Sequence, residues 1–121
     1  MNDFPAPKKL KIGLDLDQTI YGFPEFFAAF IPAMHAAGHR LCVTSNHLRS
    51  RWPEDCERLR ALGIDPDMLD PHLMQQGPVD HGRAHKRWMA KHVDFMFDDM
   101  VGFNEITKTV VFVCPHEKAI D

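Results

Sequence analysis

The sequence is poor in cysteine, in long apolar runs and in concentrated positive charge. Its 121 residues include 3 cysteines, which are too few and too scattered for a disulfide framework. It has no signal-peptide core and no apolar stretch long enough to span a bilayer, so we expect a cytoplasmic protein with no membrane partner. The net charge of -3 and the lack of a basic block argue against non-specific electrostatic binding of nucleic acid.

The sequence also lacks the ligand spacing of a zinc site. It contains 8 histidines, but only His81 and His85 lie one helical turn apart. No cysteine or third histidine is placed to complete a tetrahedral site with them. We therefore interpret the histidines as surface or helix-terminal residues.

What is present is the composition of an ordinary globular domain, with 45% hydrophobic and 26% charged residues. We expect a single domain over residues 1–121. Short β-prone runs alternate with segments of helical periodicity, which predicts an α/β fold with a parallel sheet. The predicted strands are an apolar run that ends at Asp15, then residues 40–44, a weak strand at 68–69, residues 93–97 and residues 107–113. The predicted helices begin at Pro24, at Ser50 or Trp52, and near Val79, and they end near Gly38, Gly63 and His92; Pro32 is expected to kink or interrupt the first.

Acidic and hydroxyl side chains close three of the predicted strands, namely Asp15, Thr44 and Asp98. The carboxyl ends of parallel strands meet at one edge of a sheet, so we expect these residues to converge. Period-two alternation also directs Asp17 to the same side as Asp15. Two such carboxylates repel unless a cation or a shared proton separates them, and Mg²⁺ prefers oxygen ligands. The pattern therefore predicts a metal site at this edge.

Four motifs in chain order carry a family resemblance. They read LDLDQTI, LCVTSN, HKRWMAKH and FMFDD, and together they lie within residues 13–99. This order of Asp-x-Asp-x-Thr, Thr/Ser, Lys and Asp-Asp resembles the haloacid dehalogenase superfamily of phosphohydrolases. The resemblance implies a three-layer Rossmann-like core with a mainly parallel five-stranded sheet. One departure is Gln18, which stands where family members often carry glycine.

The resemblance also implies an activity, namely hydrolysis of phosphomonoesters with Mg²⁺ through an aspartyl-phosphate. Asp15 would be the nucleophile, and Asp17 would protonate the leaving oxygen and later activate water. Thr44 and Lys86 would complete the catalytic set by binding and neutralising the phosphoryl group. The expected substrate-binding residues are Thr44, Ser45, Asn46 and Lys86. The expected metal ligands are Asp15, Asp17, Asp98 and Asp99, and the choice between Asp98 and Asp99 as the direct ligand stays open.

Lys86 is preferred to Lys91 on geometric grounds. A helix that leads into a parallel strand starts near the carboxyl edge of the sheet and runs away from it. Five further residues carry Lys91 roughly 7 to 8 Å along the axis and turn it by about 140°. Lys91 then suits the helix C-terminus, where a cation complements the helix dipole. Arg83 and His81 lie nearer the helix start and remain rivals.

A cap domain is missing from this arrangement. The residues between the motifs are all assigned to helices, strands and loops of the core. Capless members of the superfamily tend to act on large or exposed substrates or to close the site with a neighbouring subunit. We expect either self-association or a broad, weak preference among phosphomonoesters. The class of enzyme suggests a nucleotide or a sugar phosphate as the substrate. The side chains of Tyr21, Phe23, His47, Arg49 and Arg51 would border the pocket, although solvated loop residues would look the same in the sequence.

Two other functions use similar residues on a similar fold. A response-regulator receiver uses a similar set of residues, but its acidic pair comes first and its Thr and Lys follow the phosphate acceptor. Here Thr44 precedes Lys86 and the Asp-Asp pair comes late, so the order argues against a receiver. A catalytically weak module of the same fold, for binding or for accepting a phosphoryl group, remains the alternative.

Overall fold

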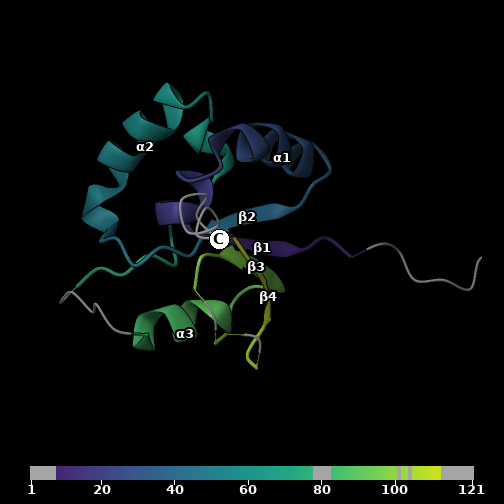
Figure 1. The fold of residues 1–121 in the computed structure, drawn as a ribbon, viewed down its shortest axis with the longest axis vertical. Coiled ribbons are helices and arrows are strands. Elements are labelled where there is room, and N and C mark those ends of the chain that lie inside the picture. Colours follow the sequence, from purple (N-terminus) through teal and green to yellow (C-terminus); the bar gives the residue numbers. More distant parts are fainter. Residues whose placement is uncertain (1–7, 78–82, 101, 104, 113–121) are drawn as a thin grey trace, which may run out of the picture.

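The computed structural model describes residues 8–77, 83–100, 102–103 and 105–112, and within them strands alternate with helices (Figure 1). The longer elements are β1 (Lys11–Leu14), α1 (Pro24–Ala36), β2 (Arg40–Val43), α2 (Trp52–Ala61), α3 (Ala84–Ala90), β3 (Phe95–Asp98) and β4 (Lys108–Val111). Short helical turns occupy Leu16–Ile20, Arg49–Arg51 and Pro66–Met68. The predicted α/β class is confirmed. No helix in these ranges is both long and apolar enough to cross a bilayer.

The strands form one parallel sheet in the order β2-β1-β3-β4. The chain goes from β1 to β2 on one side and returns to β3 on the other, so the strand order switches at β1. Asp15 and Thr44 directly follow β1 and β2, and Asp98 is the last residue of β3. The predicted convergence of these three residues on one sheet edge is therefore confirmed, and they lie where open α/β sheets bind ligands.

The sheet has four strands in the described part of the chain, so the prediction of five is not confirmed there. The weak strand expected at residues 68–69 is wrong, because Pro66–Met68 forms a 3₁₀ turn. Among residues 66–71, only Asp70 pairs with β2: its N–H donates to the Leu41 carbonyl at 2.8 Å, and its carbonyl accepts from the Val43 N–H at 2.9 Å. Pro66 and Pro71 lack the N–H that a longer ladder would need.

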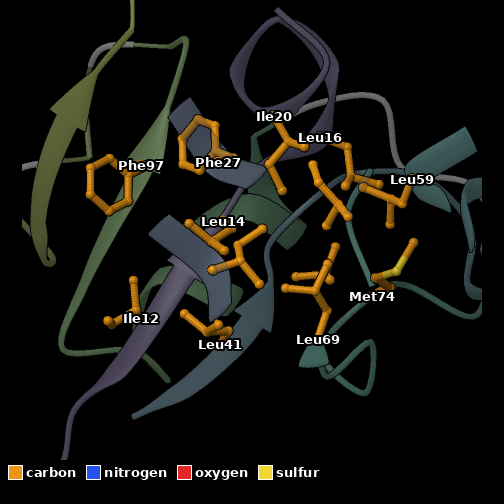
Figure 2. Packing of buried hydrophobic residues seen from close by; sticks show 13 residues of the cluster. Ile12, Leu14, Leu16, Ile20, Phe27, Leu41, Leu59, Leu69, Met74 and Phe97 are labelled. Atoms are coloured by element: carbon orange, nitrogen blue, oxygen red, sulfur yellow. The ribbon is translucent and has the colours of Figure 1, made fainter. Parts of the chain in front are cut away.

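Two separate apolar clusters cover the two faces of the sheet. Ile12 and Leu14 of β1 pack with Phe27 of α1 and Leu59 of α2 (Figure 2). On the opposite face, a second cluster joins the sheet to α3, and its fully buried members include Cys42, Met89, Ala90 and Met96. Figure 1 shows α1 and α2 on one side of the sheet and α3 on the other. The fold therefore has three layers, helix on sheet on helix.

Most helix ends follow the expected sequence signals. Gly38 and Gly63 have φ of +89° and +80° and lie just beyond α1 and α2, as helix-ending glycines do. Pro32 does not interrupt α1, which runs on to Ala36 with Ile31 fully buried beside it. The third helix was expected to end near His92, but α3 ends at Ala90. A tighter turn follows, in which the Lys91 and His92 N–H groups donate to the carbonyls three residues earlier. The predicted start of this helix near Val79 lies outside the described residues.

The Asp70 carboxylate should make the free energy of unfolding depend on pH in the acidic range. Burial by itself raises the pKa of Asp70, but hydrogen bonds from the His72 N–H and from Arg40 outweigh it and lower that pKa to about 2. A carboxylate with a lowered pKa stabilises the fold above its unfolded pKa of about 3.9, and the contribution is lost as the pH falls towards 2. We expect Asp70→Asn to lower the free energy of unfolding near neutral pH. The difference from wild type should shrink between about pH 4 and pH 2 in urea titrations.

The control is Asp67→Asn, which removes an exposed carboxylate from the same segment. Asn at position 70 keeps the backbone bridge to β2, so a loss of stability reports on the carboxylate. An Asp70→Asn penalty of the same size at neutral and acidic pH would contradict this account.

Candidate functional site

Three carboxylates gather where β1 and β3 end. Asp15, Asp98 and Asp99 each offer an oxygen, and the three oxygens lie within 4.8 Å of one another. Asp15 and Asp98 are buried, and Asp99 is partly buried. Their elements explain the grouping, because β1 and β3 are paired neighbours whose carboxyl ends leave the sheet together.

Lys86 of α3 is the cation within this group. Its Nζ lies 2.9 Å from an oxygen of Asp15 and 2.9 Å from an oxygen of Asp98, and it donates to the Thr44 carbonyl at 2.6 Å. The side chain is only 2% exposed. Burial lowers the pKa of Lys86, but the two carboxylates raise it by more, so the ammonium stays charged. Lys91 is exposed at the C-terminus of α3, so the geometric preference for Lys86 is confirmed.

The cluster holds more carboxylates than cations, and burial together with this imbalance raises the pKa of its buried members. Burial and the neighbouring Asp98 raise the pKa of Asp15, and the Lys86 ammonium offsets this only in part. Asp98 behaves in the same way, since burial raises its pKa and Lys86 counters it. When all three carboxylates are ionised, one ammonium leaves an excess of negative charge, and a divalent cation bound there would neutralise it and favour the ionised forms. A donor set made only of carboxylate oxygens suits a hard cation such as Mg²⁺.

Thr44 supplies an unpaired donor beside Lys86. It is fully buried, and its Oγ1 has no hydrogen-bond partner among the described residues. A buried hydroxyl without a partner is costly unless a ligand satisfies it. A phosphoryl oxygen, which accepts hydrogen bonds strongly, fits this position.

The neighbouring predicted substrate-binding residues have structural contacts of their own. The Ser45 hydroxyl accepts from the His47 N–H at 3.1 Å and so fixes the turn after β2. The Asn46 carbonyl accepts a hydrogen bond from the Gln75 side chain. The site therefore favours Thr44 over Ser45 as the residue that meets the phosphoryl group.

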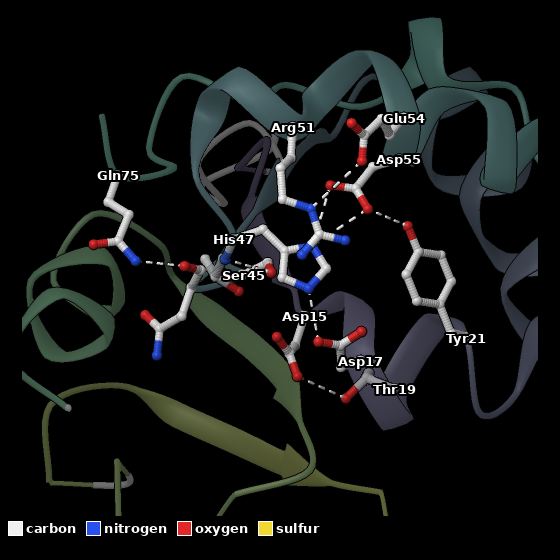
Figure 3. Close-up of polar contacts among 12 residues, drawn as sticks. Asp15, Asp17, Thr19, Tyr21, Ser45, His47, Arg51, Glu54, Asp55 and Gln75 are labelled. Atoms are coloured by element: carbon white, nitrogen blue, oxygen red, sulfur yellow. Dashed lines mark hydrogen bonds and ion pairs between the residues drawn. The ribbon is translucent and has the colours of Figure 1, made fainter. Parts of the chain in front are cut away.

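Asp17 lies in the turn that follows β1, apart from the carboxylate cluster. Its side chain is 61% exposed, and its Oδ2 lies 2.7 Å from His47 Nε2 (Figure 3). Thr19, from the same turn, donates to Asp15 Oδ2 over a long 3.4 Å. The grouping of metal-ligating atoms does not include the Asp17 carboxylate, so the structure gives no support to the prediction that it is a metal ligand.

Asp55 is a member of the site that the sequence analysis missed. It is buried at the start of α2 and accepts a hydrogen bond from the Tyr21 hydroxyl at 2.8 Å (Figure 3). His47 Nδ1 lies 3.1 and 3.2 Å from its two oxygens. The available signal was that Asp55 precedes Leu59 by four residues, which puts a carboxylate on the buried face of the helix.

His47 is the positive centre of this second cluster. Its hydrogen bonds with Asp17 and Asp55 raise the pKa of His47 to about 9, although burial opposes the shift. The same contact lowers the pKa of Asp17, so the pair is ionised at neutral pH. A hollow of about 380 Å³ opens beside Asp17 and is also lined by Gln18, Tyr21, Gly22 and Arg58. Of the predicted bordering residues, Tyr21 therefore lines this hollow and His47 contacts Asp17.

Comparisons of the chain with protein-family models, with curated proteins and with solved structures give no match.

The carboxylate cluster predicts binding of Mg²⁺. We expect Mg²⁺ to raise the melting temperature and to give a measurable heat in calorimetric titration. Asp98→Asn and Asp99→Asn should both weaken binding, Asp98→Asn by more, because Asp98 is fully buried within the cluster. Asp94→Asn is the matched control, since Asp94 lies just before the opposite end of β3. Equal weakening by the control, or no response to Mg²⁺ in the wild type, would contradict the assignment.

The turn that carries Asp17 contains local backbone strain at Gln18. With φ of +61°, Gln18 is the one non-glycine residue with positive φ in the described part of the chain. This explains in physical terms why glycine suits the position. We expect Gln18→Gly to raise the free energy of unfolding by about 0.5–1 kcal/mol, because the left-handed strain is partly offset by greater freedom of glycine in the unfolded chain. Denaturant titration measures it, and Gln76→Gly, at an exposed position without positive φ, should bring no gain.

Proposed function

We propose that this protein is a Mg²⁺-dependent phosphomonoester hydrolase of the haloacid dehalogenase type. The observation that carries the proposal is the position of Lys86 Nζ, 2.9 Å from both Asp15 and Asp98 and bonded to Thr44. Hydrolysis of a phosphate monoester needs catalysis on the order of 20 kcal/mol, most of it from positioning and charge neutralisation. A buried lysine, a buried unpaired hydroxyl and a carboxylate cluster suited to Mg²⁺ are the groups that such a reaction requires.

Asp15 is the nucleophile in this proposal. Lys86 Nζ donates to its Oδ1 at 2.9 Å, whereas its Oδ2 accepts a long 3.4 Å hydrogen bond from Thr19. The less engaged Oδ2 is therefore the oxygen that attacks phosphorus, while the leaving oxygen departs. The pKa of Asp15 is raised to about 8 by burial, and Lys86 opposes that rise, so it favours the ionised form that attacks. Lys86 also neutralises charge on the transferring group.

The residues around Asp15 bind the phosphoryl group. Thr44 Oγ1 donates a hydrogen bond to one of its oxygens, which gives this buried hydroxyl the partner that it lacks. Asp15, Asp98 and Asp99 would hold Mg²⁺, which, when bound, neutralises charge on phosphoryl oxygens.

Asp17 handles the proton from outside the buried cluster. In the first step the protonated form of Asp17, which its lowered pKa makes the minor form at neutral pH, gives its proton to the departing oxygen of the leaving group. The leaving group would occupy the hollow of about 380 Å³ beside Asp17. In the second step it takes a proton from the water that attacks the aspartyl-phosphate. Inorganic phosphate leaves, and Asp15 and Asp17 return to their starting states. The contact with His47, which lowers the pKa of Asp17, favours the ionised form needed in the second step.

The openness of the site bears on the choice of substrate. Between β1 and β2 the chain builds only a short turn and α1, so no lid element arises there. We propose that selection among phosphomonoesters, nucleotide or sugar phosphates among them, is weak in the monomer. Self-association that covers the strand ends is the alternative source of selectivity.

The nucleophile and the lysine provide the direct test. We expect Asp15→Asn and Lys86→Met each to lower kcat/KM for a phosphomonoester by on the order of 10³-fold or more, because each removes a group that acts on the reacting atoms. Lys91→Met is the matched control and should change activity by less than about twofold. Malachite-green detection of released phosphate, with Mg²⁺ present, measures all four proteins.

Folding has to be checked for Lys86→Met, since it leaves two buried carboxylates without their cation. Asp15→Asn removes one of those charges and is the safer variant. Wild-type turnover by a folded Asp15→Asn protein would rule out the aspartyl-phosphate. Phosphate transfer to Asp15 without later release would favour the phosphoacceptor alternative.

A further inference from the structure

We propose that His47 is a positioning residue for Asp17, held in place by Asp55 and Tyr21. This inference rests on the proposed function, in which Asp17 handles the proton of the leaving group. It assigns His47, Asp55 and Tyr21 to the reaction without direct contact with the reacting atoms. The whole arrangement lies outside the Asp15, Asp98 and Asp99 cluster.

The first support is an unbroken chain of hydrogen bonds. The Tyr21 hydroxyl donates to Asp55 Oδ1 at 2.8 Å, and Asp55 meets His47 Nδ1 at 3.1 and 3.2 Å. His47 Nε2 then reaches Asp17 Oδ2 at 2.7 Å. An imidazolium carries a proton on each ring nitrogen, so it satisfies both carboxylates at once. Figure 3 shows the His47 ring between Asp17 and Asp55.

The second support is that every member except Asp17 is fixed. The Asp55 side chain is 3% exposed and that of His47 is 12% exposed. The His47 backbone is held by its N–H bond to Ser45, and the Tyr21 ring is covered by the Arg58 guanidinium at 3.8 Å. An exposed carboxylate such as Asp17 samples several rotamers unless a rigid partner selects one.

The third support is the closed loop that these contacts make. Tyr21 is the C-cap residue of the same turn that carries Asp17. Asp55 of α2 therefore contacts this turn in two ways, directly through Tyr21 and indirectly through His47. His47 holds Oδ2 of Asp17, and no hydrogen bond in the described part of the chain engages its Oδ1. Oδ1 is thus left for the leaving oxygen or for water. Holding a proton-transfer group in one orientation is a recognised source of rate.

The test compares a poor leaving group with a good one. Departure of an alkoxide needs the proton that the protonated form of Asp17 carries, whereas p-nitrophenolate departs without one. We expect His47→Ala to lower kcat/KM for n-propyl phosphate by about 10- to 100-fold and for p-nitrophenyl phosphate by less than about threefold. Since kcat/KM reports the steps up to phosphorylation of Asp15, the comparison isolates the leaving-group step. A merely structural role would lower both values alike.

Two milder variants and a control complete the design. His47→Gln keeps an N–H donor towards Asp17 and should recover part of the loss with n-propyl phosphate. Tyr21→Phe keeps the ring but frees one oxygen of Asp55, and should give a smaller loss with the same preference. His35→Ala, at an exposed position on α1, should change neither substrate. If His47→Ala fails to fold, as judged by circular dichroism, His47→Gln and Tyr21→Phe decide the question.

The possible outcomes distinguish a failure of the positioning role from a failure of the proposed hydrolase activity. Equal losses on both substrates, or no loss on either, would overturn the positioning role while leaving the hydrolase intact. Absence of Asp15-dependent turnover in the wild type would overturn both. A selective loss with n-propyl phosphate supports both.

Discussion

The burial of one lysine between carboxylates organises this molecule. Lys86 loses nearly all contact with water, and a buried ammonium is tolerated only when it is paired and hydrogen-bonded. Its partners Asp15, Asp98 and Thr44 stand at the ends of three adjacent strands, so one side chain from α3 ties the carboxyl edge of the sheet together. Loss of one partner of such a buried pair costs about 3–5 kcal/mol of stability. The contacts of Lys86 in the candidate site therefore also stabilise the fold.

The candidate site divides into a dry half and a wet half. Asp15, Thr44 and Lys86 lie buried, where a low dielectric would strengthen their effect on a phosphoryl group. Asp17 lies largely in water and contacts His47. In the proposed reaction the sheet edge would provide the electrostatics, and the turn after β1 would provide the proton transfer.

The sequence predicted the parts of the structure that depend on local patterns. β-branched and apolar runs, helix-ending glycines and polar residues after strands were enough to predict the sheet edge with Asp15, Thr44 and Asp98. Lys86 needed the family resemblance and the direction of the helix that carries it. The short strand near residue 69 failed because prolines on both sides limit pairing to Asp70. The sequence offered no way to see that Asp55 reaches His47, since that contact depends on how α2 packs over the turn after β1.

The distance along the chain between the partners of Lys86 has a consequence for folding. Lys86 and Asp15 are 71 residues apart, and Lys86 and Thr44 are 42 apart. Contacts this remote form only after most of the loop-closure entropy has been lost, and they slow folding. An ammonium also gains nothing from burial before its carboxylates are in place. The site and the native sheet should therefore appear together in one cooperative late step, and a nascent chain that ends before β3 would have no buried lysine at all.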